Sequence, residues 1–200
     1  MDDQAAPSIS AAKRALRERI LGGRVSLAAG VLQEAGCEIT RRLLELPAMR
    51  TATIVAAYVG LDSEVPIWLL VEALTKRGTT VLLPVLEADD SLTWGAFAPG
   101  STLVAGRKGI RQPASGASSE LSAAQVVVVP GVCYDNRGNR LGRGGGSYDR
   151  ALRKLPAGIT TIGLALDSDV VGNVPVEPHD QQVQLIVTPT RVITSDDGSN

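Results

Sequence analysis

The chain has 200 residues with 20 basic and 21 acidic side chains, which gives a formal net charge of −1 at pH 7. This balance argues against a dominant surface for nucleic acid or for membrane, and no apolar run approaches the ~20 residues that span a bilayer. Two cysteines are too few for a disulfide framework, and the N-terminal segment lacks the regions of a signal peptide. We therefore expect a cytoplasmic protein with reduced thiols.

The first half of the chain predicts two helices followed by buried strands. Residues 8–24 (SISAAKRALRERILGGR) read as a helix that Ser8 or Ser10 caps and that Gly22-Gly23 should break or bend. A second helix is expected from Ser26 to Leu46. Two short apolar runs are typical of strands buried on both faces, and the helix between them should stop at Gly78. The runs are residues 51–59 (TATIVAAYV) and residues 79–86 (TTVLLPVL), the second of which should end at Pro84.

The second half continues the alternation of strands and helices. The expected strands are residues 92–97 (LTWGAF, on a hairpin), 125–131 (QVVVVPG), 159–167 (ITTIGLALD) and 183–189 (VQLIVTP). Residues 108–123 should be mostly loop, and residues 148–155 (YDRALRKL) should form a helix. Such alternation predicts an α/β three-layer sandwich, with a mostly parallel sheet flanked by helices on both faces. We expect one domain over residues 1–200, with mobile tails at 1–7 and 195–200.

Ligands of such sheets bind outside the carboxyl ends of the strands. Four segments follow the predicted strand ends and should gather on one rim: residues 58–64, 84–86 and 130–135, and Asp167.

One segment in the second half of the chain is unusually rich in glycine. Residues 139–150 (NRLGRGGGSYDR) hold four glycines in five positions, with Arg140 before them and Arg143 among them. Bare backbone can approach a ligand closely, and successive N–H groups can form a nest for phosphate oxygens. The helix expected from Ser147 or Tyr148 and the two arginines add positive charge. The segment predicts a phosphate cradle, and a flexible surface loop is the competing interpretation. It is neither a Walker A loop nor a dinucleotide fingerprint, because it lacks their spacing.

Residues 129–152 (VPGVCYDNRGNRLGRGGGSYDRAL) resemble the signature of the 5-formyltetrahydrofolate cyclo-ligase (5,10-methenyltetrahydrofolate synthetase) family. Other family features occur in the expected order, so the resemblance covers essentially the whole chain: KRALR, YVGLDSEV, LLPV, GIRQP and VPVEPHDQQVQLIVTP. The resemblance implies a fold of the NagB/RpiA/CoA-transferase-like type. It also implies that ATP phosphorylates the formyl oxygen of 5-formyltetrahydrofolate, after which N10 attacks. The products would be 5,10-methenyltetrahydrofolate, ADP and phosphate, with Mg²⁺ as cofactor.

The resemblance implies a role for each matching residue. The implied catalytic residues are Arg143, Lys13 and Tyr148. The implied ATP-binding residues are Lys13, Arg17, Arg140, Leu141, Gly142, Arg143, Gly144, Gly145, Gly146, Ser147 and Tyr148. The implied folate-binding residues are Val59, Glu64, Arg143, Gly144, Gly145, Gly146 and Ser147. Asp149 and Asp180 would bind Mg²⁺, which prefers oxygen ligands.

Several of these residues have other interpretations. Lys13 and Arg17, four apart on a helix, would by themselves indicate only a solvated basic face. Tyr148 could stack on the pterin, bind phosphate or anchor its helix. Ser147 and Lys108 replace aromatic residues found in relatives. His179, the only histidine, is expected to be structural, and Cys133 is not expected to act as a nucleophile.

Two other functions compete with the ligase. One is a non-catalytic nucleotide-binding regulator, and the other is an enzyme like the phosphosugar isomerases or CoA-transferases. The expected partners are small molecules, with no nucleic acid or membrane, and the expected state is a monomer or weak dimer.

Overall fold

The computed structural model describes residues 8–195 except residues 29, 62, 63, 99, 115, 117 and 118. The tails predicted at 1–7 and 195–200 lie outside this part of the chain, apart from Ser195. No helix within the described residues combines the length and the apolar character needed to cross a membrane.

A seven-stranded sheet forms the centre of the molecule. Its order is β12 (Val192–Thr194), β11 (Leu185–Val187), β9 (Thr160–Leu164), β6 (Val126–Val129), β1 (Ile54–Ala56), β2 (Thr80–Leu86) and β3 (Leu92–Phe97). Strands β11 to β2 are parallel to their neighbours, whereas the two edge strands, β12 and β3, run antiparallel. The predicted mostly parallel sheet is therefore confirmed.

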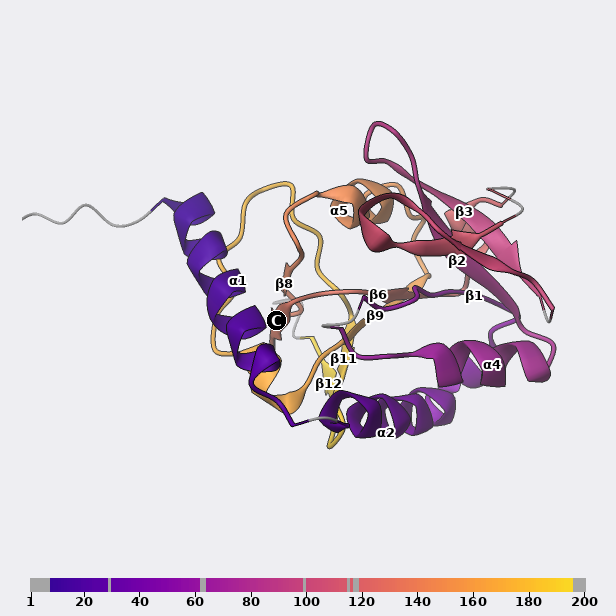
Figure 1. Cartoon of the computed structure of the whole chain (residues 1–200), viewed down its shortest axis with the longest axis horizontal. Coiled ribbons are helices and arrows are strands. Elements are labelled where there is room, and N and C mark those ends of the chain that lie inside the picture. Colours follow the sequence, from indigo (N-terminus) through magenta and orange to yellow (C-terminus); the bar gives the residue numbers. More distant parts are fainter. Residues whose placement is uncertain are drawn as a thin grey trace, which may run out of the picture.

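Helices cover both faces of this sheet, as the predicted three-layer sandwich requires. Figure 1 shows α2 (Val31–Glu45) and α4 (Trp68–Lys76) on one side and α5 (Ser147–Leu152) on the other. The strands pack against both helix layers, because successive side chains of a strand point to opposite faces of the sheet. Val126 and Val128 pack with the α2 and α4 side, while Val127 and Val129 pack with Leu152 of α5. The short helix α3 (Pro47–Thr51) follows α2.

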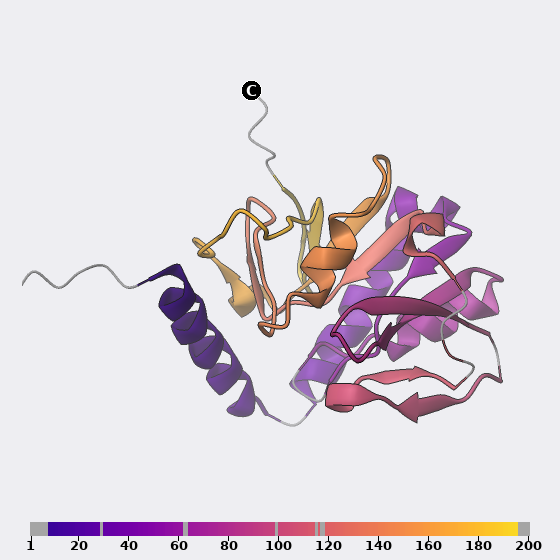
Figure 2. The same cartoon turned by 90° about the horizontal axis from the view of Figure 1, so that it is seen from above.

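The longest helix, α1 (Ile9–Val25), lies beside a second, smaller sheet. That sheet has the order β10 (Val170–Val171), β7 (Cys133–Asp135) and β8 (Arg140–Leu141). Ile20 of α1 packs against Val132, Cys133 and Leu141. Near the helix end, Arg24 forms a buried ion pair with Asp169 at 2.8 Å. These contacts fix α1 against the small sheet, and Figure 2 shows the helix at this end of the molecule.

A two-stranded ladder and three 3₁₀ turns complete the described fold. β4 (Leu103–Ala105) and β5 (Arg111–Pro113) form a two-stranded ladder around the 3₁₀ turn η1 (Arg107–Gly109). Two further 3₁₀ turns are η2 (Leu121–Ala123) and η3 (Asp167–Asp169). Residues 108–123, predicted to be mostly loop, thus include the short strand β5 and η2.

Two predicted interruptions do not occur. Helix α1 begins after Ser8, whose hydroxyl accepts the N–H of Ala11, and it continues through Gly22 and Gly23. Arg24 holds the last turn through Asp169, so a tertiary contact outweighs the poor helix propensity of glycine.

Pro84 lies inside β2 and does not end it. Backbone groups alternate between the two edges of a strand, and Leu82 accepts the N–H of Ala57 on the β1 side. Pro84 faces that same side, where β1 has already ended at Ala56. The missing N–H of proline therefore costs no ladder hydrogen bond.

Candidate functional site

A cavity of about 900 Å³ opens at the carboxyl ends of β1 and β6. These strands are neighbours, but the chain leaves β1 through α4 and leaves β6 through α5, on opposite faces of the sheet. Such a switch point is where ligands bind in open α/β sheets. Tyr58 and Val59 line the cavity after β1, and Pro130 and Gly131 line it after β6.

The expected rim is only partly correct. Residues after β1, β2 and β6 line the cavity, whereas Asp167 is not among its lining residues. Asp167 instead accepts the hydroxyls of Thr188 and Thr190, at 2.7 and 2.6 Å. Asp135 also lies elsewhere, because its carboxylate accepts backbone N–H groups of Arg137, Asn139 and Val174. This matches the turn-forming role that aspartate often has.

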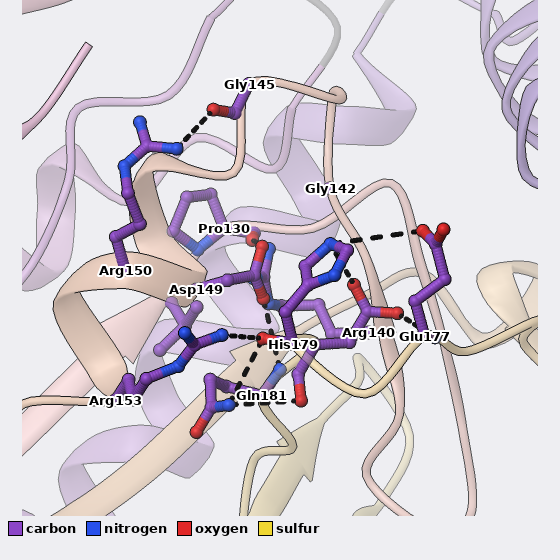
Figure 3. A network of polar contacts seen from close by, with 12 residues as sticks. Pro130, Arg140, Gly142, Gly145, Asp149, Arg150, Arg153, Glu177, His179 and Gln181 are labelled. Carbon is purple, nitrogen blue, oxygen red and sulfur yellow. Dashed lines mark hydrogen bonds and ion pairs between the residues drawn. The ribbon is translucent and has the colours of Figure 1, made fainter. Parts of the chain in front are cut away.

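The glycine-rich loop, residues 142–146, forms one wall of the cavity. Gly144 and Gly146 have φ values of +101° and +65°, a region that favours glycine. The loop is held from two sides: Arg17 of α1 donates to the carbonyl of Gly142 at 2.7 Å, and Arg150 of α5 donates to that of Gly145 at 3.1 Å. Figure 3 shows the Arg150 contact. Arginines from two helices therefore fix the backbone of the loop.

Arg143 leaves this loop and reaches the segment that follows β1. Its Nε donates to Glu64 Oε1 at 2.9 Å. The other oxygen of Glu64 accepts the N–H of Leu61 at 3.0 Å. The side chain of Glu64 is 11% exposed and that of Arg143 is 39% exposed. Glu64 is thus fixed in the wall, while the arginine is accessible to a ligand.

On the α1 side, Lys13 lies between two carboxylates. Its Nζ is 2.8 Å from Glu177 and 2.5 Å from Asp180, and the residue is 7% exposed. Burial would lower the pKa of Lys13, but the hydrogen bonds to Asp180 and Glu177 raise it above its ordinary value. Burial would raise the pKa of Asp180, and the bond from Lys13 keeps it below the ordinary value instead. Lys13 and Asp180 are therefore charged at neutral pH.

Arg140 and Asp149 form a second ion pair, at 2.7 Å (Figure 3). The Arg140 side chain is 3% exposed and also donates to the carbonyl of Pro130. Asp149 accepts the N–H of Gln181 as well, through the same Oδ1. The pair joins α5, β8 and the segment before β11. Arg140 is therefore a buried part of the cavity wall, not an exposed cation.

Tyr148, the second residue of α5, stands with its ring edge-on to Trp94 at 6.2 Å between centroids. Its hydroxyl is buried and has no hydrogen-bond partner within the described residues. Burial raises the pKa of Tyr148, so the phenol is neutral at physiological pH. A buried hydroxyl without a partner is costly, and a bound ligand could supply the missing hydrogen bond.

Donors for a divalent cation lie at the same end as Lys13. Ligand atoms of Glu177, His179 and Asp180 lie within 4.8 Å of one another. The hydrogen bonds described for Asp149 both use Oδ1. Oxygen donors of this kind suit Mg²⁺, which typically takes one or two carboxylates and completes its shell with phosphate oxygens and water. The carboxylates of Glu177 and Asp180 thus suit Mg²⁺, the cation that the family resemblance implies.

Every residue predicted for ATP, folate or metal lines this one cavity. Their individual roles stay predictions. Glu177 and Asp90 were not among the predicted site residues, and His179 was expected to be structural, although all three line the cavity. The position of Glu177, three residues before Asp180, was a usable signal, whereas nothing in the turn sequence of Asp90 indicated a site. Cys133 is buried away from the lining, and burial raises the pKa of its thiol to about 12.

Comparison with known proteins agrees with this geometry. The sequence profile of the 5-formyltetrahydrofolate cyclo-ligase family matches residues 9–189. The chain is 35% identical to a 5-formyltetrahydrofolate cyclo-ligase of Mycolicibacterium smegmatis, over 92% of this chain and 96% of the relative. It is 34% identical to that of Escherichia coli K12, over 80% and 91%.

The fold is also similar to a solved structure. The 5,10-methenyltetrahydrofolate synthetase of Aquifex aeolicus superimposes with a TM-score of 0.83 at 27% identity, covering 94% of this chain and 95% of that one. The chain belongs to the 5-formyltetrahydrofolate cyclo-ligase family.

Proposed function

We propose that this protein converts 5-formyltetrahydrofolate to 5,10-methenyltetrahydrofolate with ATP as co-substrate, releasing ADP and phosphate. The observation that supports this most is the arrangement around Arg143. A glycine-rich loop and the cations of α1 lie on one side of it, and the carboxylate of Glu64, 11% exposed, lies on the other. A cavity of this size can hold both substrates with Arg143 between them.

The phosphates of ATP would lie against the loop. The backbone of Gly144 and Gly146 carries no Cβ, and a Cβ added at Gly144 would lie 3.7 Å from the guanidinium of Arg17. Arg17 and Lys13 supply positive charge from α1, and the loop supplies backbone N–H groups. Positioning and charge neutralisation are the main requirements of phosphoryl transfer.

Mg²⁺ would be held by Asp149 and Asp180, on the same side of the cavity as Lys13. When bound, it neutralises charge on the phosphate oxygens. Asp180 already accepts Lys13 and the N–H of Glu177 through Oδ2, and Lys13 would then be shared between that carboxylate and the phosphate chain.

The pterin would lie against Val59 and Glu64. The pterin edge presents N–H donors, and an ionised carboxylate offers only acceptors. Glu64 is prepared for this role, because the N–H of Leu61 fixes its orientation.

The chemistry follows from the poor leaving ability of a formamide oxygen. The γ-phosphoryl group of ATP moves to the formyl oxygen, and the bond to ADP breaks. N10 then attacks the formyl carbon, the N10 proton is released, and phosphate leaves with the former formyl oxygen as the ring closes. Arg143 would stabilise the negative charge that develops on the transferred oxygens. Its exposed guanidinium can reach this position without disturbing the core.

An absorbance assay tests the proposal. The methenyl product absorbs in the near ultraviolet, apart from 5-formyltetrahydrofolate, so its band should grow only when protein, folate, ATP and Mg²⁺ are all present. ATP binding without any growth of the band would indicate the non-catalytic regulator instead. Growth of the band at the same rate without ATP would contradict the phosphorylation step.

We further propose that the protein acts in the cytoplasm as a single domain, as a monomer or weak dimer. Residues of one chain supply every group named above, and the family match spans residues 9–189. Size-exclusion chromatography with light scattering over a range of concentrations tests the oligomeric state.

A further inference from the structure

Arg150 of α5 is outside the cavity lining, yet its guanidinium connects the glycine-rich loop to another part of the chain. Its Nη1 donates to the carbonyl of Gly145 at 3.1 Å, and its Nη2 donates to the carbonyl of Asp90 at 2.7 Å. A longer contact of 3.5 Å joins Nη2 to the hydroxyl of Ser147. The two terminal nitrogens therefore join the loop to the turn between β2 and β3.

The turn that carries Asp90 is closed by its own hydrogen bonds. Glu87 donates its N–H to the carbonyl of Ser91 at 3.0 Å and accepts the N–H of Asp90 at 3.1 Å. The carboxylate of Asp89 accepts both the N–H and the hydroxyl of Ser91. The turn also joins two paired strands of the central sheet. Arg150 thus connects the loop to a well-supported part of the fold.

The bond to Gly145 fixes the orientation of one peptide unit of the loop. In a trans peptide the carbonyl and the N–H of the next residue point in opposite directions, and the described residues contain no cis peptide bond. Arg150 binds the Gly145 carbonyl from outside the cavity (Figure 3). The N–H of Gly146 therefore points the other way, toward the cavity that this residue lines. Within the described part of the chain that N–H has no hydrogen-bond partner.

The contact between Arg150 and the loop depends on bare backbone. Gly146 has a φ of +65°, and a Cβ added to it would lie 3.0 Å from Nη1 of Arg150, closer than an ordinary contact. Arg150 itself is exposed. Because substitutions of exposed residues change stability little, removal of this side chain should leave the fold intact and alter only the loop.

We propose that Arg150 is a positioning residue for phosphoryl transfer. It directs the Gly146 N–H into the cavity, where this group donates to an oxygen of the phosphate chain of ATP. The inference rests on the proposed function. Arg17 binds the Gly142 end of the loop from α1, and Arg150 binds the other end. A donor oriented in advance needs no rearrangement when negative charge develops on the transferred group. Without Arg150 this peptide unit would rotate more freely, because glycine permits many backbone conformations.

Kinetics of Arg150→Met test this role, with turnover followed by the methenyl band. The value of kcat/KM for ATP should fall by about tenfold or more, because a misaligned donor stabilises the transition state less. KM for the folate should stay within about twofold, since the folate does not depend on this donor. Unchanged kcat/KM for ATP, or an equal loss for both substrates, would overturn the proposal.

Arg41→Met is the matched control. Arg41 lies on α2 outside the cavity lining, is 50% exposed and donates to Glu38 and Glu45. Its removal therefore also takes away two surface hydrogen bonds, but at a distance from the loop. Both variants should unfold at similar urea concentrations, and Arg41→Met should keep the kinetic constants of the wild type.

A second variant tests the guanidinium fork. Arg150→Lys keeps the charge but offers one nitrogen in place of the two that bind separate carbonyls, so kcat/KM for ATP should still fall by about fivefold. Full activity of Arg150→Lys would show that charge alone suffices and would overturn the positioning role.

An NMR measurement on the loop separates this inference from the proposed function. When glycine is labelled at both its carbonyl carbon and its nitrogen, amide signals correlated with a labelled carbonyl arise only from Gly-Gly pairs, here from Gly23, Gly145 and Gly146. A nonhydrolysable ATP analogue with Mg²⁺ should move the Gly146 amide proton to lower field in the wild type, and less than half as far in Arg150→Met. Gly23, on α1 outside the cavity lining, is the internal reference.

The two possible failures are distinguishable. Equal movement of the Gly146 signal in the wild type and Arg150→Met, or no movement in either, would overturn the inference. Absence of methenyl product from the wild type, with a Gly146 signal that still depends on Arg150, would count against the proposed function alone.

Discussion

Arg143 of the glycine-rich loop is the ion-pair partner of Glu64, at 2.9 Å, although 79 residues separate them in sequence. The family resemblance predicts different tasks for the two residues, charge stabilisation and pterin recognition. In the structure they satisfy each other and so connect the loop after β1 with the loop before α5. Binding of substrates at this point would redistribute the two charges while keeping both hydrogen-bonded, which avoids leaving a charge unpaired inside the cavity.

Arg143→Ala should lower turnover by about 10²-fold or more, because it removes a donor aimed at developing negative charge. The change should cost about 1 kcal/mol or less in the free energy of unfolding, since the pair is partly exposed. Turnover is measured from the methenyl band and stability from urea unfolding. Arg111→Ala, on β5 outside the cavity lining, is the control. Normal turnover of Arg143→Ala would remove this residue from the mechanism.

Lys13→Met should raise KM for ATP by about tenfold or more and leave KM for the folate nearly unchanged. The ammonium group lies between Glu177 and Asp180 at the α1 end, where we propose that the phosphates bind. Lys154→Met removes an exposed lysine after α5 and should change neither constant. A larger rise in KM for the folate than for ATP would contradict the assignment of Lys13 to the ATP phosphates.

The extent to which this site could be predicted depends on sequence distance. The loop at Gly142–Gly146 was identifiable because its composition is local: glycines, arginines and the helix after them form one continuous segment. The resemblance to a family supplied Lys13 and Asp180, which are 167 residues apart and meet only in the folded chain. Glu177 was missed although its position three residues before Asp180 was a usable signal, and only the folded chain shows that this carboxylate faces Lys13 on α1.

The fold shows the same limit. Buried strands were predicted from apolar runs, and the sheet contains them. Tertiary context decided the rest: Arg24 extends α1 beyond two glycines, and Pro84 is tolerated where β1 has ended. The edge strand β12 was not predicted, since three residues at the end of the sheet carry too little pattern.

The Lys13–Asp180 ion pair predicts how stability depends on pH. The pKa of Asp180 is lowered from 3.8 and that of Lys13 is raised from 10.5. The contribution of Asp180 to the free energy of unfolding is therefore present above pH 3.8 and is lost as pH falls through its lower native pKa. The contribution of Lys13 to the same free energy is lost only above pH 10.5. Asp180→Asn should cost about 1 kcal/mol of unfolding free energy at pH 7.

The matching measurement is urea unfolding of the wild type and Asp180→Asn at several pH values. The difference in unfolding free energy between the two proteins should stay constant between about pH 5 and pH 9 and shrink below about pH 4. A difference that keeps its full size below pH 4 would contradict the assignment to Asp180.

The two cysteines should differ in reactivity. Cys37 is exposed on α2, whereas Cys133 is buried on β7 and its pKa is raised to about 12 by burial. The thiolate is the reactive form, so an aromatic disulfide reagent at pH 8 should modify one thiol in the native protein and both in denaturant. Alkylation of Cys37 should leave turnover intact, because this residue lies outside the cavity lining. Rapid modification of both native thiols would contradict the packing of α1 on β7.

Neighbouring glycines of the loop offer a matched pair for the last prediction. Gly144 has a φ of +101°, so Gly144→Ala should cost about 1–2 kcal/mol in unfolding free energy even though a Cβ would meet nothing closer than Arg17 at 3.7 Å. Gly145 has no positive φ, and a Cβ there would be 3.6 Å from Ser147 Oγ, an ordinary contact. Gly145→Ala should therefore stay within about 0.5 kcal/mol of the wild type. Urea unfolding of both variants measures the difference, and equal stability would show that the left-handed backbone at Gly144 is not required by the folded loop.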